Sequence, residues 1–233
     1  MPIAFVGANS VLNSTSGTST ALPMPAATAA GNILYAFVAS VGASPTATPP
    51  AGWSLVSSFS PGSTLTSWLF RKVAVAGEPT ATFTWSSSGR NLGLSLAYSG
   101  IDTAVSSNAA QVHSTDGLGA VAAPVLGANA GDWLVTVGIG RESPGTATTK
   151  DWTNSTGTDV ERIEVVTGGA ATDVKIAAAW FDSNGGVAGG STARSLSSTP
   201  DMGQRHVWSL LLPLPAGELA GGNPWSHMGR PQR

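Results

Sequence analysis

The sequence predicts an all-β protein: an antiparallel β-sandwich, jelly-roll-like and built from two similar halves. The first reason is composition, because the 233 residues include 29 glycines and 15 prolines, which suit short strands and turns better than long helices. The second is a series of short apolar or alternating segments separated by turn residues. The third is an internal repeat, which fits a sandwich made of two similar halves.

The repeat is clearest at residues 30–38 and 130–138. Both copies read Ala-Gly followed by Asn or Asp, and then an apolar run. Their flanking residues match about 99 positions apart: Pro25 with Pro124, Ser44-Pro45 with Ser143-Pro144, and Trp53 with Trp152. We therefore expect two equivalent strands in equivalent halves of the fold.

The predicted strands follow from runs and alternation of apolar residues. Ile33 to Ser40 is nearly continuous in apolar residues, which indicates a strand buried on both sides or at the centre of a sheet. Residues 8–22 are polar and form either a loop or a polar edge strand, and residues 86–90 are predicted to form a hairpin loop. The other strands expected in the first half are residues 3–6, 53–56, 64–75, 81–86 and 92–98. Those of the second half are residues 109–113, 132–140, 160–166, 174–181, 193–198 and 206–212.

Alternation also assigns the faces of these strands, since successive side chains of a strand point to opposite faces. Trp68 and Phe70 are expected on one face of their strand, with Leu65 and Leu69 on the other. Four apolar residues of the next long strand share one face: Leu92, Leu94, Leu96 and Tyr98.

The predicted domain organisation is one sandwich over residues 1–213, with the repeat at about 23–102 and 122–213. Two separate small sandwiches are the alternative, because about 100 residues is an ordinary domain size. After Pro213 the chain becomes rich in Gly and Pro, which predicts an extended C-terminal arm over residues 214–233.

Charge and cysteine content bound the class of protein. Charged residues make up 10% of the chain and the net charge is −2, against roughly 25% charged residues in an average domain. No basic stripe is present, so we expect no nucleic-acid partner. There are no cysteines. Residues 1–7 do not resemble a signal peptide and no apolar run is long enough to span a bilayer, so no membrane insertion is expected.

The sequence offers no catalytic signature. His113, His206 and His227 do not form a metal-binding pair by spacing. Glu161 and Glu164 are expected on opposite faces of a strand, so they do not form a glycosidase pair. The Asp- and Gly-rich residues 182–186 are either a Ca²⁺ site or a plain turn. We therefore expect no enzyme, no resident metal and no cofactor.

The eight tryptophans have two interpretations. Most fall in or beside predicted strands, so core packing is the first expectation, and exposed rings that stack on sugars are the alternative. Trp225 lies in the arm, where a single aromatic side chain can fill a pocket on a partner. The arm residues expected to bind a partner are Pro224, Trp225, His227, Met228, Arg230 and Arg233.

Four segments of the first half together resemble a known module. They are Ala30-Gly31-Asn32-Ile33-Leu34, residues 49–56 (PPAGWSLV), residues 71–79 (RKVAVAGEP) and residues 97–102 (AYSGID). This set is similar to a module of virion proteins from actinobacterial tailed phages, often labelled minor tail or structural proteins, and of some secreted bacterial proteins. The resemblance covers about residues 30–102 and contains no catalytic residues.

The resemblance implies a structural protein of a tailed phage virion. A minor tail protein is expected first, and a capsid decoration protein or a carbohydrate-binding module that contacts the host surface are the alternatives. The expected partners are other virion proteins, further copies of the chain and, for the last alternative, a host surface glycan. The expected location is the virion, after synthesis in the host cytoplasm.

Overall fold

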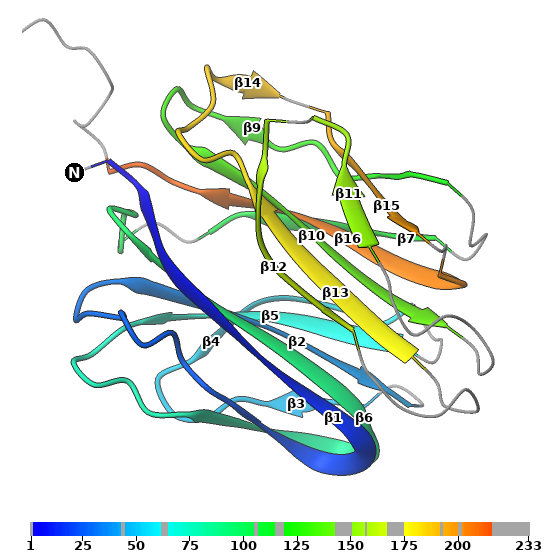
Figure 1. The fold of residues 1–233 in the computed structure, drawn as a ribbon. Helices are drawn as coiled ribbons and strands as arrows, with labels where there is room; N and C mark the ends of the chain where they lie inside the picture. Colours follow the sequence, from blue (N-terminus) through cyan, green and yellow to red (C-terminus); the bar gives the residue numbers. More distant parts are fainter. Residues whose placement is uncertain are drawn as a thin grey trace, which may run out of the picture.

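The computed structural model confirms the predicted antiparallel β-sandwich, in which two sheets pack face to face (Figure 1). It describes residues 2–42, 45–61, 65–104, 107–114, 119–142, 151–156, 158–166, 175–191, 193–199 and 202–215. Within these ranges every regular element is a strand. No helix that could cross a membrane occurs in this part of the chain.

The two sheets have the same strand order. The first sheet runs β1-β6-β2-β5-β4, and the second runs β7-β16-β10-β13-β12. The strands of the first are β1 (Ala4–Leu22), β2 (Ile33–Val41), β4 (Ser54–Phe59), β5 (Leu65–Val73) and β6 (Ala81–Ser99). Those of the second are β7 (Ala109–Ser114), β10 (Trp133–Glu142), β12 (Val160–Val166), β13 (Lys175–Asp182) and β16 (Gln204–Leu212). Each half of the chain therefore supplies one sheet, and among the strands that the structure describes none is exchanged between the two.

Small outer layers cover the far face of each sheet. In the first half, β1 and β6 bend over, and β3 (Ala47–Thr48) pairs with the bent part of β6. In the second half the same positions are taken by separate strands, in the order β11-β15-β8. These are β8 (Val121–Ala122), β11 (Asp151–Asn154) and β15 (Ser195–Thr199), and a further small pair is formed by β9 (Gly127–Ala128) and β14 (Gly190–Ser191).

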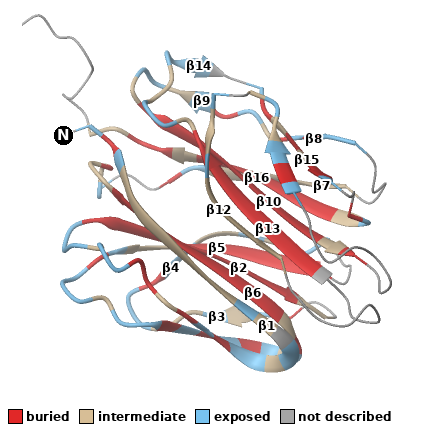
Figure 2. Ribbon diagram, in the orientation of Figure 1, coloured by how far each residue is buried: buried red, intermediate tan, exposed pale blue. Residues whose placement is uncertain are grey.

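The central strands β2 and β10 are buried along most of their length (Figure 2). On β2, residues 33, 35, 37 and 39 face the core between the sheets, while Leu34, Ala36 and Val38 face the outer core of the first half. On β10, residues 133, 135, 137 and 139 face the same central core. The apolar run from Ile33 is thus explained by burial on both faces, as predicted.

The repeat is visible in the hydrogen bonds of its turns. Asn32 accepts the N–H of Ala29 on its side-chain oxygen (2.8 Å), and Asp132 accepts the N–H of Asn129 in the same way (2.8 Å). The glycines before them, Gly31 and Gly131, have φ of 85° and 90°, a region that favours glycine. The two copies therefore use the same local chemistry to begin the central strand of each sheet.

The edge strands β4 and β12 also share a β-bulge at equivalent positions. β4 has a bulge between Leu55 and Ser57, and β12 has one between Glu161 and Ile163. Leu55 and Glu161 pair with Phe70 and Phe181, which hold equivalent places beside β2 and β10. The halves thus match in strand order, turn and bulge.

Some details of the sequence interpretation are wrong. Residues 86–90 do not form a hairpin loop, because β6 continues through them, and Gly89 allows this path since a Cβ there would collide with the carbonyl oxygen of Val41. Pro124 corresponds to Pro23 and not to Pro25, because the equivalent hydroxyls of Ser95 and Ser209 donate to the carbonyls of Pro23 and Pro124.

Trp152 does not correspond to Trp53. It lies within β11, whose counterpart β3 ends at Thr48, whereas Trp53 follows that strand. Both rings nevertheless pack in the outer core of their own half. The polar stretch over residues 8–22, for which a loop or an edge strand was expected, is part of the edge strand β1.

A buried polar network links the two sheets beside β1 and β12. The Tyr98 hydroxyl donates to Asp182 (2.9 Å) and accepts from the indole N–H of Trp180 (2.9 Å). Arg162 binds both oxygens of Asp182 at 2.7 and 2.9 Å, and its guanidinium lies 4.4 Å from the centre of the Phe5 ring. The carboxylate is fully buried, so the paired arginine is what makes its burial tolerable.

Gly138 provides a test of the packing on the outer face of β10. A Cβ at this position would lie 2.5 Å from Cζ3 of Trp152 and 3.0 Å from Cδ1 of Leu196. Gly138→Ala is therefore expected to destabilise the protein by about 1–3 kcal/mol, the usual effect of overpacking a core. Urea denaturation would measure the change.

Gly127→Ala is the matched control. It also lies in a strand of the second half, but a Cβ there would meet nothing within 4 Å. Its stability should stay within about 0.5 kcal/mol of the wild type. Equal effects for the two variants would contradict the packing of Trp152 on Gly138.

Candidate functional site

The partner-binding residues expected in the arm lie outside the described part of the chain. These are Pro224, Trp225, His227, Met228, Arg230 and Arg233. The structure does describe where the chain leaves the sandwich. The N–H of Leu214 donates to Asp132 (2.8 Å), and the carbonyl of Pro213 accepts the N–H of Asp102 (3.0 Å). The arm therefore starts from a fixed point beside the turn that begins β10.

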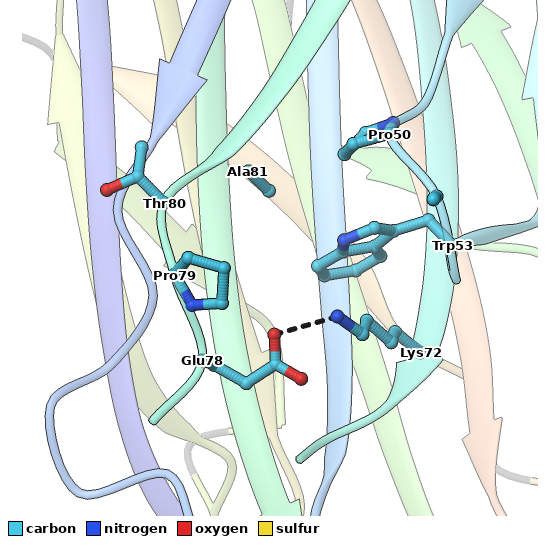
Figure 3. Close-up of a pocket in the computed structure, with 8 residues that line it drawn as sticks. Pro50, Trp53, Lys72, Glu78, Pro79, Thr80 and Ala81 are labelled. Carbon is cyan, nitrogen blue, oxygen red and sulfur yellow. Dashed lines mark hydrogen bonds and ion pairs between the residues drawn. The ribbon is translucent and has the colours of Figure 1, made fainter. Parts of the chain in front are cut away.

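A small pocket lies at the end of the first sheet where β4 and β6 begin and β5 ends, here called the turn end (Figure 3). Trp53 and Lys72 line it from the β4 and β5 side, and Glu78 and Pro79 face them from the segment that leads into β6. Pro50, Ala51, Thr80 and Ala81 complete the lining. Its volume is about 60 Å³, far below the roughly 300–1,000 Å³ of ligand pockets.

An ion pair closes one side of this pocket. Nζ of Lys72 lies 2.8 Å from Oε2 of Glu78, and the side chains are 16% and 2% exposed. The other carboxylate oxygen of Glu78 accepts the N–H of Val75 at 2.7 Å. Because Glu78 is almost completely buried, both contacts are needed to satisfy its charge. The arrangement fixes the turn between β5 and β6 to the end of β5.

All four segments that carry the phage-module resemblance meet at this end of the sheet. Gly31 donates to the carbonyl of Ala74 (2.9 Å), and the N–H of Ala74 donates to Asn32 (2.8 Å). Trp53 and Lys72 share the pocket. Arg71 donates to the carbonyls of Asp102 and Thr103, each at 3.2 Å. The four segments thus form one connected unit, here called the turn-end clamp.

The Lys72–Glu78 pair was not predicted from the sequence. A lysine and a glutamate six positions apart match no motif, and they meet only because the chain turns at Gly77, whose φ is 67°. The Gly-Glu-Pro turn was visible in the sequence, but the buried partner of its glutamate was not.

Two of the three histidines lie side by side. His206 on β16 is fully buried and pairs across the strands with His113 on β7, with ring centres 5.0 Å apart. Burial and, to a smaller extent, the charge of the neighbouring His113 together lower the pKa of His206 to about 3. Burial also lowers the pKa of His113, against the opposing effect of a hydrogen bond with the backbone of Arg205. His227 lies outside the described residues.

The turn at residues 182–186 is not arranged for Ca²⁺. Both carboxylate oxygens of Asp182 are taken by Arg162, and one also accepts the Tyr98 hydroxyl. Asn184 donates its backbone N–H to the same carboxylate (3.1 Å) and has φ of 38°. In the described residues no cluster of histidine and acidic side chains could hold a metal. The segment is a turn that anchors a structural ion pair.

The expectation that Glu161 and Glu164 lie on opposite faces is wrong. The bulge at Arg162 inserts one residue, so Glu161 pairs with Phe181 and Glu164 with Ala179, both of which belong to the outer core. The two glutamates therefore share the outer face, where the N–H of Trp152 donates to Glu164 (3.1 Å).

A third carboxylate, Asp151, is close enough to affect both glutamates. Burial raises the pKa of Glu161, and Asp151 raises it further. Burial also raises the pKa of Glu164, the hydrogen bond from Trp152 lowers it, and the charges of Glu161 and Asp151 raise it again. In the described residues they do not form a cluster that could hold a metal. These carboxylates therefore form an acidic surface and not a defined site.

The tryptophans in the described residues are core residues, as first expected. Their rings range from fully buried to 8% exposed. Sugar stacking needs an open ring face, so these seven rings do not form a platform for glycan. They are Trp53, Trp68, Trp85, Trp133, Trp152, Trp180 and Trp208.

No family model, curated protein or solved structure matches this chain. The fold and the candidate site define an all-β sandwich in which hydrogen bonds and a buried ion pair hold the turn-end clamp together.

Lys72→Met tests the ion pair of the turn-end clamp. The substitution leaves Glu78 buried with only the Val75 N–H, so we expect a loss of about 1–3 kcal/mol of unfolding free energy. Glu78→Gln alone should also destabilise the protein.

The Lys72→Met, Glu78→Gln double variant completes the comparison. It should be more stable than the sum of the two losses predicts, by at least about 0.5 kcal/mol, because the residues interact directly. Additive losses in urea denaturation would contradict a structural ion pair.

Proposed function

We propose that this chain is a structural protein of a tailed bacteriophage virion, and that it is a minor tail protein. The observation that carries the proposal is the turn-end clamp. The sequence segments that resemble the phage module meet through the hydrogen bonds of Ala74 and Arg71 and the pocket beside Trp53. The resemblance therefore follows a connected structural unit and not scattered turn residues.

The fixed origin of the arm is a second support. Asp102 is the last residue of the resembling segments, and its N–H binds the carbonyl of Pro213. Asp132 holds the next residue, Leu214. A rigid sandwich with an anchored extended segment suits docking on neighbouring subunits, because extended chains bind through many main-chain and pocket contacts. In this proposal residues 216–233 contact other virion proteins or further copies of the chain.

Capsid decoration is the alternative location for the same structural role. The glycan-binding alternative gains no support from the described tryptophans, since none has an open ring face. The proposed location is the assembled particle.

The proposal is tested on purified particles of a phage that encodes the chain. Mass spectrometry should detect the protein in the particles at a fixed ratio to the other structural proteins. Immunogold labelling should place it on the tail. Label on the head would support the decoration alternative against the tail assignment, and absence from the particles would contradict the structural role.

Truncation after Pro215 tests the arm. It removes residues 216–233 but keeps the Leu214–Asp132 contact, so the sandwich should keep its thermal stability. We expect incorporation into particles to fall at least about tenfold, because anchoring aromatic residues at interfaces often contribute 2 kcal/mol or more. Trp225→Ala should reproduce much of the loss, and Trp225→Phe should reproduce little of it. Normal incorporation of the truncated protein would show that the arm does not dock.

A further inference from the structure

Two buried polar side chains, Ser67 and His206, meet on the β4–β7 side of the sandwich, and they belong to different sheets. On this side, here called the histidine seam, the edge strand β4 of the first sheet lies beside the edge strand β7 of the second. Ser67 on β5 reaches across the interface to His206 on β16, with Oγ and Nδ1 3.0 Å apart. The indole N–H of Trp208 donates to the same hydroxyl (3.2 Å).

The other ring nitrogen of His206 has no partner. Nε2 is buried and makes no hydrogen bond. The groups that face the ring are Phe59 from β4 (4.9 Å between ring centres), His113 from β7 (5.0 Å), Ser67 from β5 and Trp208 from its own strand. None of these is a carboxylate. A protonated imidazole has two N–H donors, so charging His206 in place would leave one donor and a positive charge buried without an acceptor.

The other half of the chain shows that this position does not require a histidine. Leu92 pairs with Ala39 and His206 pairs with Ile139, which are equivalent residues of β2 and β10. By the same register, the equivalents of the four residues around the His206 ring are apolar. Trp208 corresponds to Leu94, Ser67 to Ala178, His113 to Leu12 and Phe59 to Val165. The same fold thus packs leucines where this seam has an uncharged imidazole.

Few contacts hold the two edge strands together at the seam. The Ser57 hydroxyl donates to Gln111 (3.4 Å), and the Gln111 amide donates to the carbonyl of Ser58 (3.4 Å). The ring of Phe59 lies 6.2 Å from that of His113. These are long or non-polar contacts, so β4 and β7 can separate locally at less cost than unfolding the central strands.

We propose that His206 and His113 form an acid-sensitive latch: uncharged, they keep β4 and β7 together, and protonation of His206 opens the seam. The direction follows from linkage. The pKa of His206 is lowered to about 3 in the folded protein, whereas an unfolded or solvent-exposed histidine has a pKa of about 6.5. The closed form therefore binds fewer protons than the open form, and it loses stability as the pH falls below about 6.5 towards 3.

Hydrogen exchange of the isolated full-length protein tests the latch. Exchange rates of the β4 and β7 peptides, corrected for the intrinsic effect of pH, give the opening constant of the seam. In the wild type it should rise at least about tenfold per pH unit below about pH 6.5, as expected for uptake of one proton by His206. Peptides of β1 and β12, on the opposite side, should show a much smaller change.

His206→Leu installs the residue found at the equivalent position of the first half. Its seam should lose most of its pH dependence and keep only the part due to His113, whose pKa is also lowered by burial. His206→Gln serves as a second variant that cannot be protonated but stays polar, in case the leucine packs poorly. His227→Gln is the matched control, because it removes a histidine outside the described sandwich and should behave as the wild type.

Two results would overturn the latch. One is a wild-type seam whose opening does not change with pH. The other is an unchanged pH dependence in both His206→Leu and His206→Gln. Both are measured on the isolated protein, so they are independent of whether the chain is found in virions.

Discussion

The structure depends on the burial of two equivalent strands, β2 and β10. Each is the central strand of its own sheet and lies between equivalent neighbouring strands. Alternate residues of both strands face one shared core, and the residues between them face separate outer cores. Neither sheet could bury its inner face alone, because the inner face of each sheet is covered by the other sheet. The seams, the outer layers and the point where the arm begins are all positioned by this contact.

The two sides of this contact differ in their buried polar groups. Arg162, Asp182 and Tyr98 form a charged network on one side, and Ser67 with His206 form a neutral one on the other. Each network crosses between the sheets, so sliding or rotating one sheet would leave buried polar groups unpaired. The apolar core supplies the attraction, and these two contacts fix the alignment.

Much of the fold was predictable because it depends on local periodicity. The near-continuous apolar run from Ile33 identified a doubly buried strand, and the spacing of Trp68 and Phe70 assigned their face correctly. The Ala-Gly-Asn and Ala-Gly-Asp turns identified two equivalent halves. These features are set by residues a few positions apart, which is the range over which alternation and turn chemistry act.

What the sequence did not predict depends on long-range geometry. A bulge at Arg162 moved Glu161 and Glu164 to one face, and alternation assumes that no residue is inserted. The close approach of Gly89 to the end of β2 let one strand bend where a hairpin was expected. The partner of Glu78, and the pairing of Ser67 with a histidine 139 positions away, depend on how the finished layers meet.

Native-state hydrogen exchange along the whole chain tests the central claim most directly. If β2 and β10 are the shared centre of one cooperative sandwich, their amides should exchange only through global unfolding. They should then report the same free energy and the same denaturant dependence. A clearly lower free energy for one of the two strands would show that the halves unfold separately, and it would contradict the account of two sheets that are stable only against each other.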